Sequence, residues 1–429
     1  MMQETENVLL TNKHILLCSD DYEKNFRLYI EEFTYVKNNF CGNVFLNSND
    51  FNQYDCKSNE IIYLCGAIEQ IFKRSQFKEN QLINVIKEFS VNFDEKSKLI
   101  KVIDAGKAPL NIHNVGVYFR SFFDPCQNYF NLISNEHEFQ TLTESNKTSN
   151  AFRTGIYLSK VEENENENEV KFNLLRCSSN LGGSTDNFSK TDNNIIGLVN
   201  NVAKQFFEQP TELNHVLAQI YENKVVEGVE KKAKISEHSD KTKDMPRNGL
   251  IAFCTFYKDY SNNRFDKNSN VACSQPPKSR GGTYDYYSIN GTSVFTKLRF
   301  RLKTKDSNIN LVDKFDVILY PNSVFLISLS TNRLYTHAIV PPDLPIHRFP
   351  TRLGYVIRCS KTNAIFKNGE THIIDNDTHK YITLEKPTED GIKRLKELYV
   401  KENRSDEIIT YGNFYFSLNN GDYEKPTFF

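Results

Sequence analysis

The stretch of the chain best suited to chemistry contains a histidine and an aspartate two positions apart, His238 and Asp240. On an extended strand, residues two apart point to the same face, so an imidazole and a carboxylate would lie side by side. With one further histidine they would make the triad of two histidines and one carboxylate that holds a non-haem Fe(II) and leaves coordination positions open. The composition alone predicts about one such pair by chance, so its surroundings must support this interpretation.

The best third ligand is His337, which lies in a strand-like apolar run near the end of the β-rich part of the chain. A closing strand there could meet the strand of His238. His347 is the competitor, but it lies in a loop flanked by prolines. His215 lies on a candidate core strand, where a buried histidine without a metal is the more ordinary outcome.

Three arginines, Arg348, Arg352 and Arg358, follow this histidine. An oxygenase that uses 2-oxoglutarate needs a cation for the carboxylate farthest from the metal. Arginine suits this role because its guanidinium stays charged and can donate two parallel hydrogen bonds to a carboxylate. A surface position is the ordinary state of any one arginine, but Arg358 lies inside an apolar strand, which favours a buried partner.

These pieces together resemble AlkB-type Fe(II)/2-oxoglutarate dioxygenases. The run Asn332-Arg-Leu-Tyr-Thr-His337-Ala-Ile-Val-Pro-Pro is similar to the strand that carries the family's third metal ligand. The run Arg352-Leu-Gly-Tyr-Val-Ile-Arg358 resembles the family's Arg-x-Asn-x-Thr-x-Arg ending, with both arginines in register. It departs from that ending at Gly354 and Val356, which replace the Asn and the Thr.

Two further motifs extend the resemblance over about residues 110–366. His238-Ser-Asp240-Lys is close to the family's His-x-Asp-Lys, and Leu217-Ala-Gln-Ile-Tyr221 resembles its Leu-x-Asn-x-Tyr strand. In that strand the polar residues touch 2-oxoglutarate, and here Gln219 replaces the Asn. The four motifs are each short, but they occur in the family's order.

The resemblance implies that His238, Asp240 and His337 bind Fe(II), with 2-oxoglutarate and O2 as co-substrates. Arg352, ahead of Arg358 and Arg348, would hold the far carboxylate, assisted by Tyr221 and Gln219. The implied reaction is decarboxylation of 2-oxoglutarate coupled to hydroxylation of a substrate; hydroxylation of an N-methyl group leads to its loss as formaldehyde. The iron would carry the hard chemistry, and the protein would orient the reactants.

For the substrate, the family implies a methylated nucleic-acid base flipped into the pocket, and a protein side chain is the alternative. A basic rim for a nucleic acid could come from Lys231, Lys232, Lys234, Lys241, Lys243, Arg247, Arg299, Arg301, Lys303 and Lys305. A solvated strand face interleaved with acidic residues explains the same lysines and arginines equally well.

The fold we expect is α+β, with a double-stranded β-helix (jelly-roll) core, flanking helices and a mixed N-terminal extension. We divide the chain into residues 1–105, 106–366 (the dioxygenase-like part) and 367–429, the last with one helix. Helix-like apolar spacing occurs at 60–72 and 81–89. The acidic residues 162–169 suggest a hairpin tip, and the long loop 258–292 suggests a lid or a disordered segment.

Composition sets the remaining limits. The net charge is −1, which argues against a globally basic nucleic-acid coat but allows a local basic groove. No apolar run approaches the roughly 18 residues that span a bilayer, and the acidic N-terminus does not resemble a signal peptide, so we expect a cytoplasmic or nuclear protein without membrane partners. Two alternatives stay open: a non-enzymatic β-barrel binding or structural protein, and a cupin-like metal protein that needs neither arginine.

Overall fold

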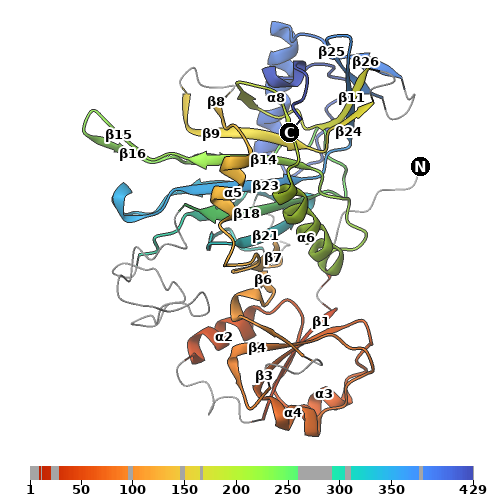
Figure 1. Ribbon diagram of the computed structural model, residues 1–429, viewed down its shortest axis with the longest axis vertical. Coiled ribbons are helices and arrows are strands. Elements are labelled where there is room, and N and C mark those ends of the chain that lie inside the picture. Colours follow the sequence, from red (N-terminus) through yellow and green to blue (C-terminus); the bar gives the residue numbers. More distant parts are fainter. Residues whose placement is uncertain are drawn as a thin grey trace.

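The chain folds into sheets with helices on their outer faces (Figure 1). Most neighbouring strands are antiparallel, which agrees with the expected α+β class, whereas the jelly-roll assignment stays a prediction. The computed structural model describes residues 9–10, 12–20, 29–94, 100–144, 150–164, 168–258, 292–304, 311–375 and 380–428.

The N-terminal sheet has five parallel strands in the order β2-β1-β3-β4-β5. The helix predicted to begin at residue 60 is wrong, because strand β3 occupies the first part of that run and helix α4 begins only at Ile68. The helix predicted at 81–89 is also wrong, because these residues belong largely to strand β4. Strand β3 is covered on both faces, and such a strand reads as an unbroken apolar run that periodicity cannot distinguish from a helix. The bounds are β1 His14–Cys18, β2 Asn43–Phe45, β3 Ile61–Ala67, β4 Ile83–Val91, β5 Lys101–Ile103, α2 Ile30–Asn39, α3 Ser48–Gln53 and α4 Ile68–Arg74.

A large ten-stranded sheet forms the centre of the molecule, in the order β12-β8-β9-β14-β23-β18-β21-β7-β6, with β13 beside β9. Strand β18 is buried along its whole length, as its apolar sequence predicts. The bounds are β6 Leu110–Ile112, β7 Gly116–Phe119, β8 Gln140–Glu144, β9 Asn150–Ser159, β12 Ser179–Leu181, β13 Asp186–Asn187, β14 His215–Tyr221, β18 Leu250–Tyr257, β21 Ser323–Ser328 and β23 Arg352–Arg358.

A smaller sheet of four strands, in the order β17-β22-β19-β20, packs on one face of the large sheet. Phe300 and Tyr335 from the small sheet share an apolar cluster with Phe253 and Phe325 from the large one. The two sheets therefore enclose a common core. The bounds are β17 Ile235–His238, β19 Lys297–Leu302, β20 Lys314–Ile318, β22 Tyr335–Val340 and, just before β22, α7 Leu329–Leu334.

The apolar runs at 316–320 and 324–329, separated by a Pro-Asn turn, predict a pair of neighbouring strands, and this prediction is wrong. Strand β20 pairs with β19 in the small sheet, whereas β21 pairs with β18 and β7 in the large sheet. The Pro-Asn turn between them carries the chain from one sheet to the other instead of closing a hairpin.

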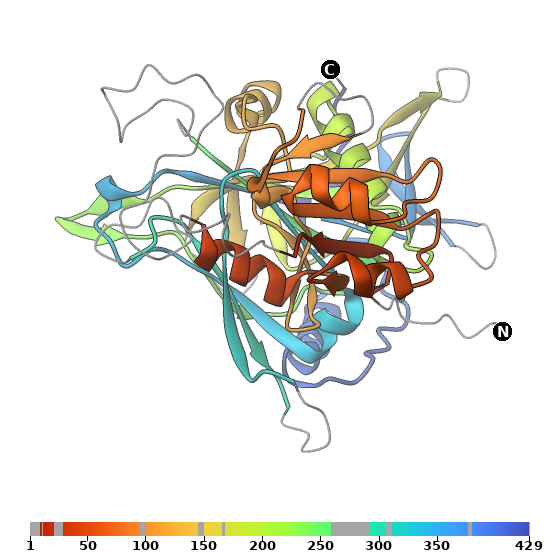
Figure 2. The ribbon, with the colours of Figure 1, turned by 90° about the horizontal axis from the view of Figure 1, so that it is seen from below.

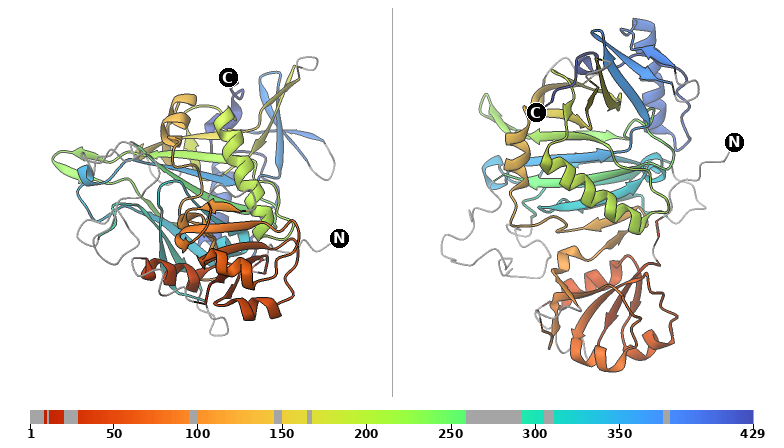
Figure 3. Two further views of the ribbon diagram at one scale, coloured as in Figure 1. Left: turned by 60° about the horizontal axis from the view of Figure 1, so that its bottom comes forward. Right: turned by 45° about the vertical axis from the view of Figure 1, so that its right-hand side comes forward.

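The opposite face of the large sheet is covered by α6 (Lys190–Phe206) and α5 (Tyr129–Glu136), as Figure 3 shows for α6. Helix α6 buries Ile195, Val199, Val202 and Phe206, which recur every three or four residues along one side. Its N-terminus carries a capping box in which Ser189 and Asp192 bond each other's backbone amides. The sheet is therefore protected from water on both faces.

The N-terminal unit is packed onto this assembly and is seen in front of it in Figure 2. The ring of His14 stacks on Phe206 of α6 with centroids 4.1 Å apart. Glu32 of α2 forms a buried ion pair with Arg120, which follows β7, at 3.0 Å. These contacts fix the N-terminal sheet against the large sheet, while a boundary at residue 105 stays a prediction.

The C-terminal part adds β25, β26 and the one helix expected there, α8, and its strands join β10, β11 and β24 in an antiparallel sheet. Strands β10 and β11 pair as the expected acidic hairpin requires. Residues 165–167, expected to form its tip, and residues 259–291, expected to form a long loop, lie outside the described part of the chain. Among the described helices, none is long and apolar enough to cross a membrane. The bounds are β10 Glu162–Asn164, β11 Glu169–Leu174, β24 Thr362–Lys367, β25 Glu370–Ile374, β26 Tyr381–Thr383 and α8 Glu389–Arg404.

A buried histidine between two carboxylates fastens α6 to the large sheet. His137 contacts Asp186 through Nδ1 at 3.2 Å and Asp192 through Nε2 at 2.7 Å, and Tyr355 of β23 donates to Asp192 at 2.8 Å. Burial would lower the pKa of His137, but the two carboxylates outweigh it and raise that pKa to about 9. The imidazolium is therefore the stable form at neutral pH.

This raised pKa makes the contribution of His137 to stability dependent on pH. The contribution is fully present below the unfolded-state pKa near 6.5 and is lost as the pH rises through about 9. Urea unfolding should therefore show a larger gap between wild type and His137→Gln at pH 6 than at pH 10, by roughly 3 kcal/mol. An equal gap at both pH values would contradict a charged His137; the exposed His347→Gln serves as the control.

Candidate metal centre

The two predicted histidine ligands lie on neighbouring strands of the small sheet. Strand β17 pairs with β22 so that His238 lies directly opposite His337, and the two ring centroids are 4.5 Å apart. His238 lies at the last position of β17, and His337 is buried in the middle of β22. The register between two strands far apart in the sequence thus places the two imidazoles side by side.

Asp240 joins them two residues beyond the end of β17. One ligand atom from each of His238, Asp240 and His337 can be chosen so that all three lie within 4.8 Å of one another. The distance from His238 Nε2 to Asp240 Oδ1 is 3.9 Å. The structure therefore brings together the three side chains that the sequence singled out, and their donor atoms are close enough for one ion to contact all of them.

Both imidazoles are in the form that can bind a metal. The Nδ1 atom of His238 lies 2.9 Å from the backbone carbonyl oxygen of Ser236, so it carries the proton and leaves the Nε2 lone pair free. Desolvation lowers the pKa of His238, whose side chain keeps 30% exposure. Deeper burial, together with neighbouring His238, lowers the pKa of His337 to about 3. Neutral imidazoles are therefore favoured at neutral pH.

Asp240 is held as an anion by Arg358. The guanidinium donates two hydrogen bonds, from Nε to Oδ2 at 2.8 Å and from Nη2 to Oδ1 at 3.0 Å, and both side chains are buried. Burial alone would raise the pKa of Asp240, but Arg358 outweighs it and holds that pKa well below its usual range. Each carboxylate oxygen keeps a second acceptor site, so this ion pair still allows Asp240 to bind a metal.

Arg352 lies at the other end of β23, and its guanidinium has free hydrogen-bonding capacity. It is 2% exposed, and its Nε and Nη1 atoms have no acceptor in the described part of the chain. Its Cζ atom lies 4.6 Å from the centre of the Tyr221 ring, directly across from it in the register of β14 and β23. Gln219, two residues earlier, lies opposite Gly354. The guanidinium of Arg352 is therefore buried against the Tyr221 ring, and its unpaired N–H groups can still bind an anion.

Gly354 makes room for this arginine. A Cβ atom built on Gly354 would lie 2.8 Å from Nη2 and 3.2 Å from Nη1 of Arg352. Gly354, one of the two residues that depart from the compared motif, is therefore the residue over which the Arg352 guanidinium lies.

The competing histidines and the third arginine lie elsewhere. His347 and Arg348 are exposed on the short helix η2 (Ile346–Arg348), and neither joins the metal-ligand group. His215 is buried on β14 opposite Arg358, and burial lowers its pKa to about 3. His215 is thus a neutral histidine of the core, as expected from its place on an apolar strand.

Sequence reasoning missed two features, one beside the site and one on the opposite face of the large sheet. The rings of Phe253 and Phe300 flank His337, with centroids 5.2 and 6.0 Å away; their only sequence signal is a place in apolar strands. The structure also groups Glu136, His137 and Asp192, but both ring nitrogens of His137 already contact carboxylates. We therefore interpret that group as a structural network.

Several side chains of the proposed basic rim already form ion pairs or hydrogen bonds within the protein. Arg299 forms an ion pair with Asp316 at 2.7 Å, and Arg301 forms one with Glu237 at 2.9 Å. Lys303 donates to the backbone of Glu402 at 2.7 Å. Lys231, Lys234 and Arg247 are exposed, and Lys305 lies outside the described residues. Two arginines of the proposed rim are therefore engaged in ion pairs, whereas three of its other cations are exposed, and a nucleic-acid partner stays a prediction.

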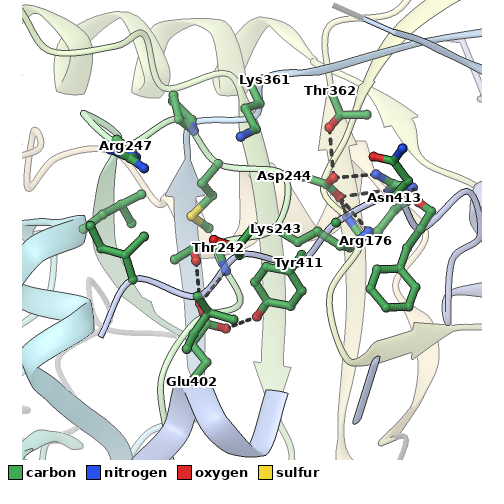
Figure 4. Close-up of a pocket in the computed structure, with 18 of the residues that line it drawn as sticks. Arg176, Thr242, Lys243, Asp244, Arg247, Lys361, Thr362, Glu402, Tyr411 and Asn413 are labelled. Atoms are coloured by element: carbon green, nitrogen blue, oxygen red, sulfur yellow. Dashed lines mark hydrogen bonds and ion pairs between the residues drawn. The ribbon is translucent and has the colours of Figure 1, made fainter. Parts of the chain in front are cut away.

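A cavity of about 460 Å³ lies beside the segment that follows Asp240, lined in part by Thr242, Lys243, Glu402 and Tyr411 (Figure 4). None of the three ligand candidates lines it. Because this cavity lacks the triad, we place the candidate chemistry between the two sheets and not here.

Comparisons with known proteins give little beyond this geometry. No family model matches the chain, and none of the curated proteins matches its sequence. Among solved structures, that of the rice AlkB homologue OsALKBH1 matches 58% of this chain and 99% of its own, with 11% identity and a TM-score of 0.32. A score this low carries no argument, so the interpretation rests on the site itself.

The buried Asp240–Arg358 pair leads to a stability prediction. Substituting Arg358 by Met leaves a buried carboxylate without its cation, which should cost about 3–5 kcal/mol in urea unfolding of the metal-free protein. Added Mn(II) should recover part of this loss, because the metal supplies the missing positive charge. Arg299→Met, which breaks a more exposed pair, should cost no more than about 1 kcal/mol. Equal losses in the two variants would contradict the account.

Proposed function

We propose that this chain is an Fe(II)- and 2-oxoglutarate-dependent dioxygenase that hydroxylates or oxidatively demethylates its substrate. The observation that carries the proposal is the convergence of His238, Asp240 and His337 on one point between the two sheets. Two neutral imidazoles and one carboxylate are the donor set of the non-haem Fe(II) oxygenases, and they leave further positions open for co-substrates. A structural zinc site would instead use four protein ligands, commonly including cysteines.

The buried polar atoms around the site fit the same groups. The Nε and Nη1 atoms of Arg352 are buried without a hydrogen-bond partner in the described part of the chain, as an anionic co-substrate would require. Orphaned buried polar atoms are costly unless a ligand satisfies them. Iron bound at the triad would supply the activation of O2, coupled to conversion of 2-oxoglutarate into succinate and CO2.

The roles of the protein residues follow from their contacts. His238, Asp240 and His337 would hold the metal, and Arg358 would keep Asp240 ionised and oriented. Because Arg358 is occupied by Asp240, we assign the far carboxylate of 2-oxoglutarate to Arg352. The contact of its Cζ atom with the Tyr221 ring helps to hold the guanidinium in place, and a guanidinium can bind a carboxylate through two parallel hydrogen bonds.

The proposal predicts that the purified protein releases succinate from 2-oxoglutarate in air with Fe(II), even before its substrate is known. His238→Ala should abolish this turnover. Arg352→Ala should raise the KM for 2-oxoglutarate about tenfold or more, because a charge-assisted hydrogen bond contributes about 1.5–3 kcal/mol. The exposed Arg348→Ala is the matched control and should leave KM unchanged.

Two outcomes would contradict this assignment. Absence of both turnover and bound iron in the wild type would favour a non-enzymatic binding protein. Turnover that survives His238→Ala would place the chemistry elsewhere in the molecule.

A second prediction uses the space above Gly354. Gly354→Ala would place a methyl group against the guanidinium of Arg352 and displace it. We expect the KM for 2-oxoglutarate to rise several-fold while Mn(II) affinity, measured by calorimetry, stays that of the wild type. Gly197→Ala, on helix α6, is the control, because a Cβ atom added there meets nothing within 4 Å. A change in metal affinity without a change in KM would argue against a co-substrate role for Arg352.

A further inference from the structure

The segment that contains His238 and Asp240 leaves the small sheet between these two residues. Strand β17 ends at His238, so the backbone amides of Ser239, Asp240 and Thr242 are not bonded within that strand. Buried backbone donors require acceptors from elsewhere. Here each of the three is bonded by a side chain from another element.

Asn332 of α7 holds the backbone of Asp240 from one side. The amide N–H of Asp240 donates to Asn332 Oδ1 at 2.9 Å, and Asn332 Nδ2 donates to the carbonyl oxygen of Asp240 at 2.9 Å. Asn332 is 1% exposed and lies five residues before His337. The short helix that leads into the second histidine strand is thus bonded to the carboxylate residue by two reciprocal hydrogen bonds.

Asn403 of α8 holds the same segment from the other side. Its Oδ1 atom accepts from the backbone amide of Ser239 at 2.9 Å and from Nζ of Lys241 at 2.5 Å. Lys241 also donates to the carbonyl oxygen of Tyr399 on the same helix at 3.3 Å. One amide oxygen therefore fixes the two residues that flank Asp240.

The neighbouring helix residue continues this contact. Glu402 accepts from the backbone amide of Thr242 at 3.1 Å and from its hydroxyl, and it also accepts from the hydroxyl of Tyr411 (Figure 4). Asp244, two residues after Thr242, accepts hydrogen bonds from Arg176 and Thr362. The segment from Ser239 to Asp244 is thus anchored by C-terminal residues and by residues from the rest of the chain.

We infer that Asn403 and Asn332 are positioning residues of the metal centre, and that the C-terminal helix α8 belongs to that centre although it lies outside residues 106–366. The inference rests on the proposed metal site. Only one residue separates His238 from Asp240, so the backbone between them sets the angle at which their side chains meet. Groups that orient metal ligands without touching the metal commonly contribute 10- to 100-fold to metal affinity.

The test compares two substitutions of Asn403 in the full-length protein. Asn403→Leu removes the acceptor at similar volume, whereas Asn403→Asp keeps an acceptor for Ser239 and Lys241. Co(II) affinity by calorimetry and the visible Co(II) spectrum report the ligand geometry directly, without turnover. We expect at least a tenfold loss of affinity and a changed spectrum in Asn403→Leu, and wild-type behaviour in Asn403→Asp.

Further variants separate positioning from general stability. Glu397→Leu replaces an exposed residue of the same helix and should leave affinity and spectrum unchanged. Asn332→Leu, at the opposite side of the segment, should reproduce the loss seen in Asn403→Leu. If Asn403→Leu does not fold, Asn332→Leu decides the question.

The outcomes distinguish this inference from the proposed function. A wild type that binds no Co(II) would overturn the metal site itself. A wild type that binds Co(II), with unchanged affinity and spectrum in Asn403→Leu or in Asn332→Leu, would overturn the inference alone. Equal losses in the Leu and Asp variants of Asn403 would also overturn it, because the acceptor oxygen would then not be the cause.

Discussion

The buried ion pair between Asp240 and Arg358 is the interaction on which the rest of the site depends. Arg358 belongs to a central strand of the large sheet, whereas Asp240 follows a strand of the small sheet. Removing both charges from water is costly, and it is tolerated only because the two hydrogen bonds are well aligned. The pair fixes the distance between the sheets at the level of the two histidines and keeps the carboxylate in its metal-binding form.

Part of this arrangement could be predicted from the sequence. The His-x-Asp spacing, the strand-like run around His337 and the resemblance of both runs to known motifs singled out the three side chains that the structure brings together. The expectation that His238 and Asp240 share one extended strand is not met, because β17 ends at His238. The partner of Arg358 could not be identified. An arginine inside an apolar strand indicates that a buried partner exists, but the partner is 118 residues away in sequence and depends on how two sheets stack.

Other features of the fold were outside the reach of local patterns. The parallel N-terminal sheet looked helical at residues 81–89 because the apolar positions of strand β4 are scattered, and at residues 60–72 because strand β3 is buried on both faces. The contact of Asn403 with Ser239 joins residues 164 apart, and an asparagine near the end of an amphipathic helix gives no sequence signal of that role. In each case the structure depends on how distant parts of the chain pack together, and the spacing of apolar residues along the chain does not show this.

The measurement that tests the central claim most directly is an anomalous diffraction experiment on crystals grown without oxygen with Mn(II) and 2-oxoglutarate. We predict one metal peak between His238, Asp240 and His337, with the far carboxylate of 2-oxoglutarate bonded to Arg352. A metal peak at another place, or none between these three side chains at saturating Mn(II), would contradict the account.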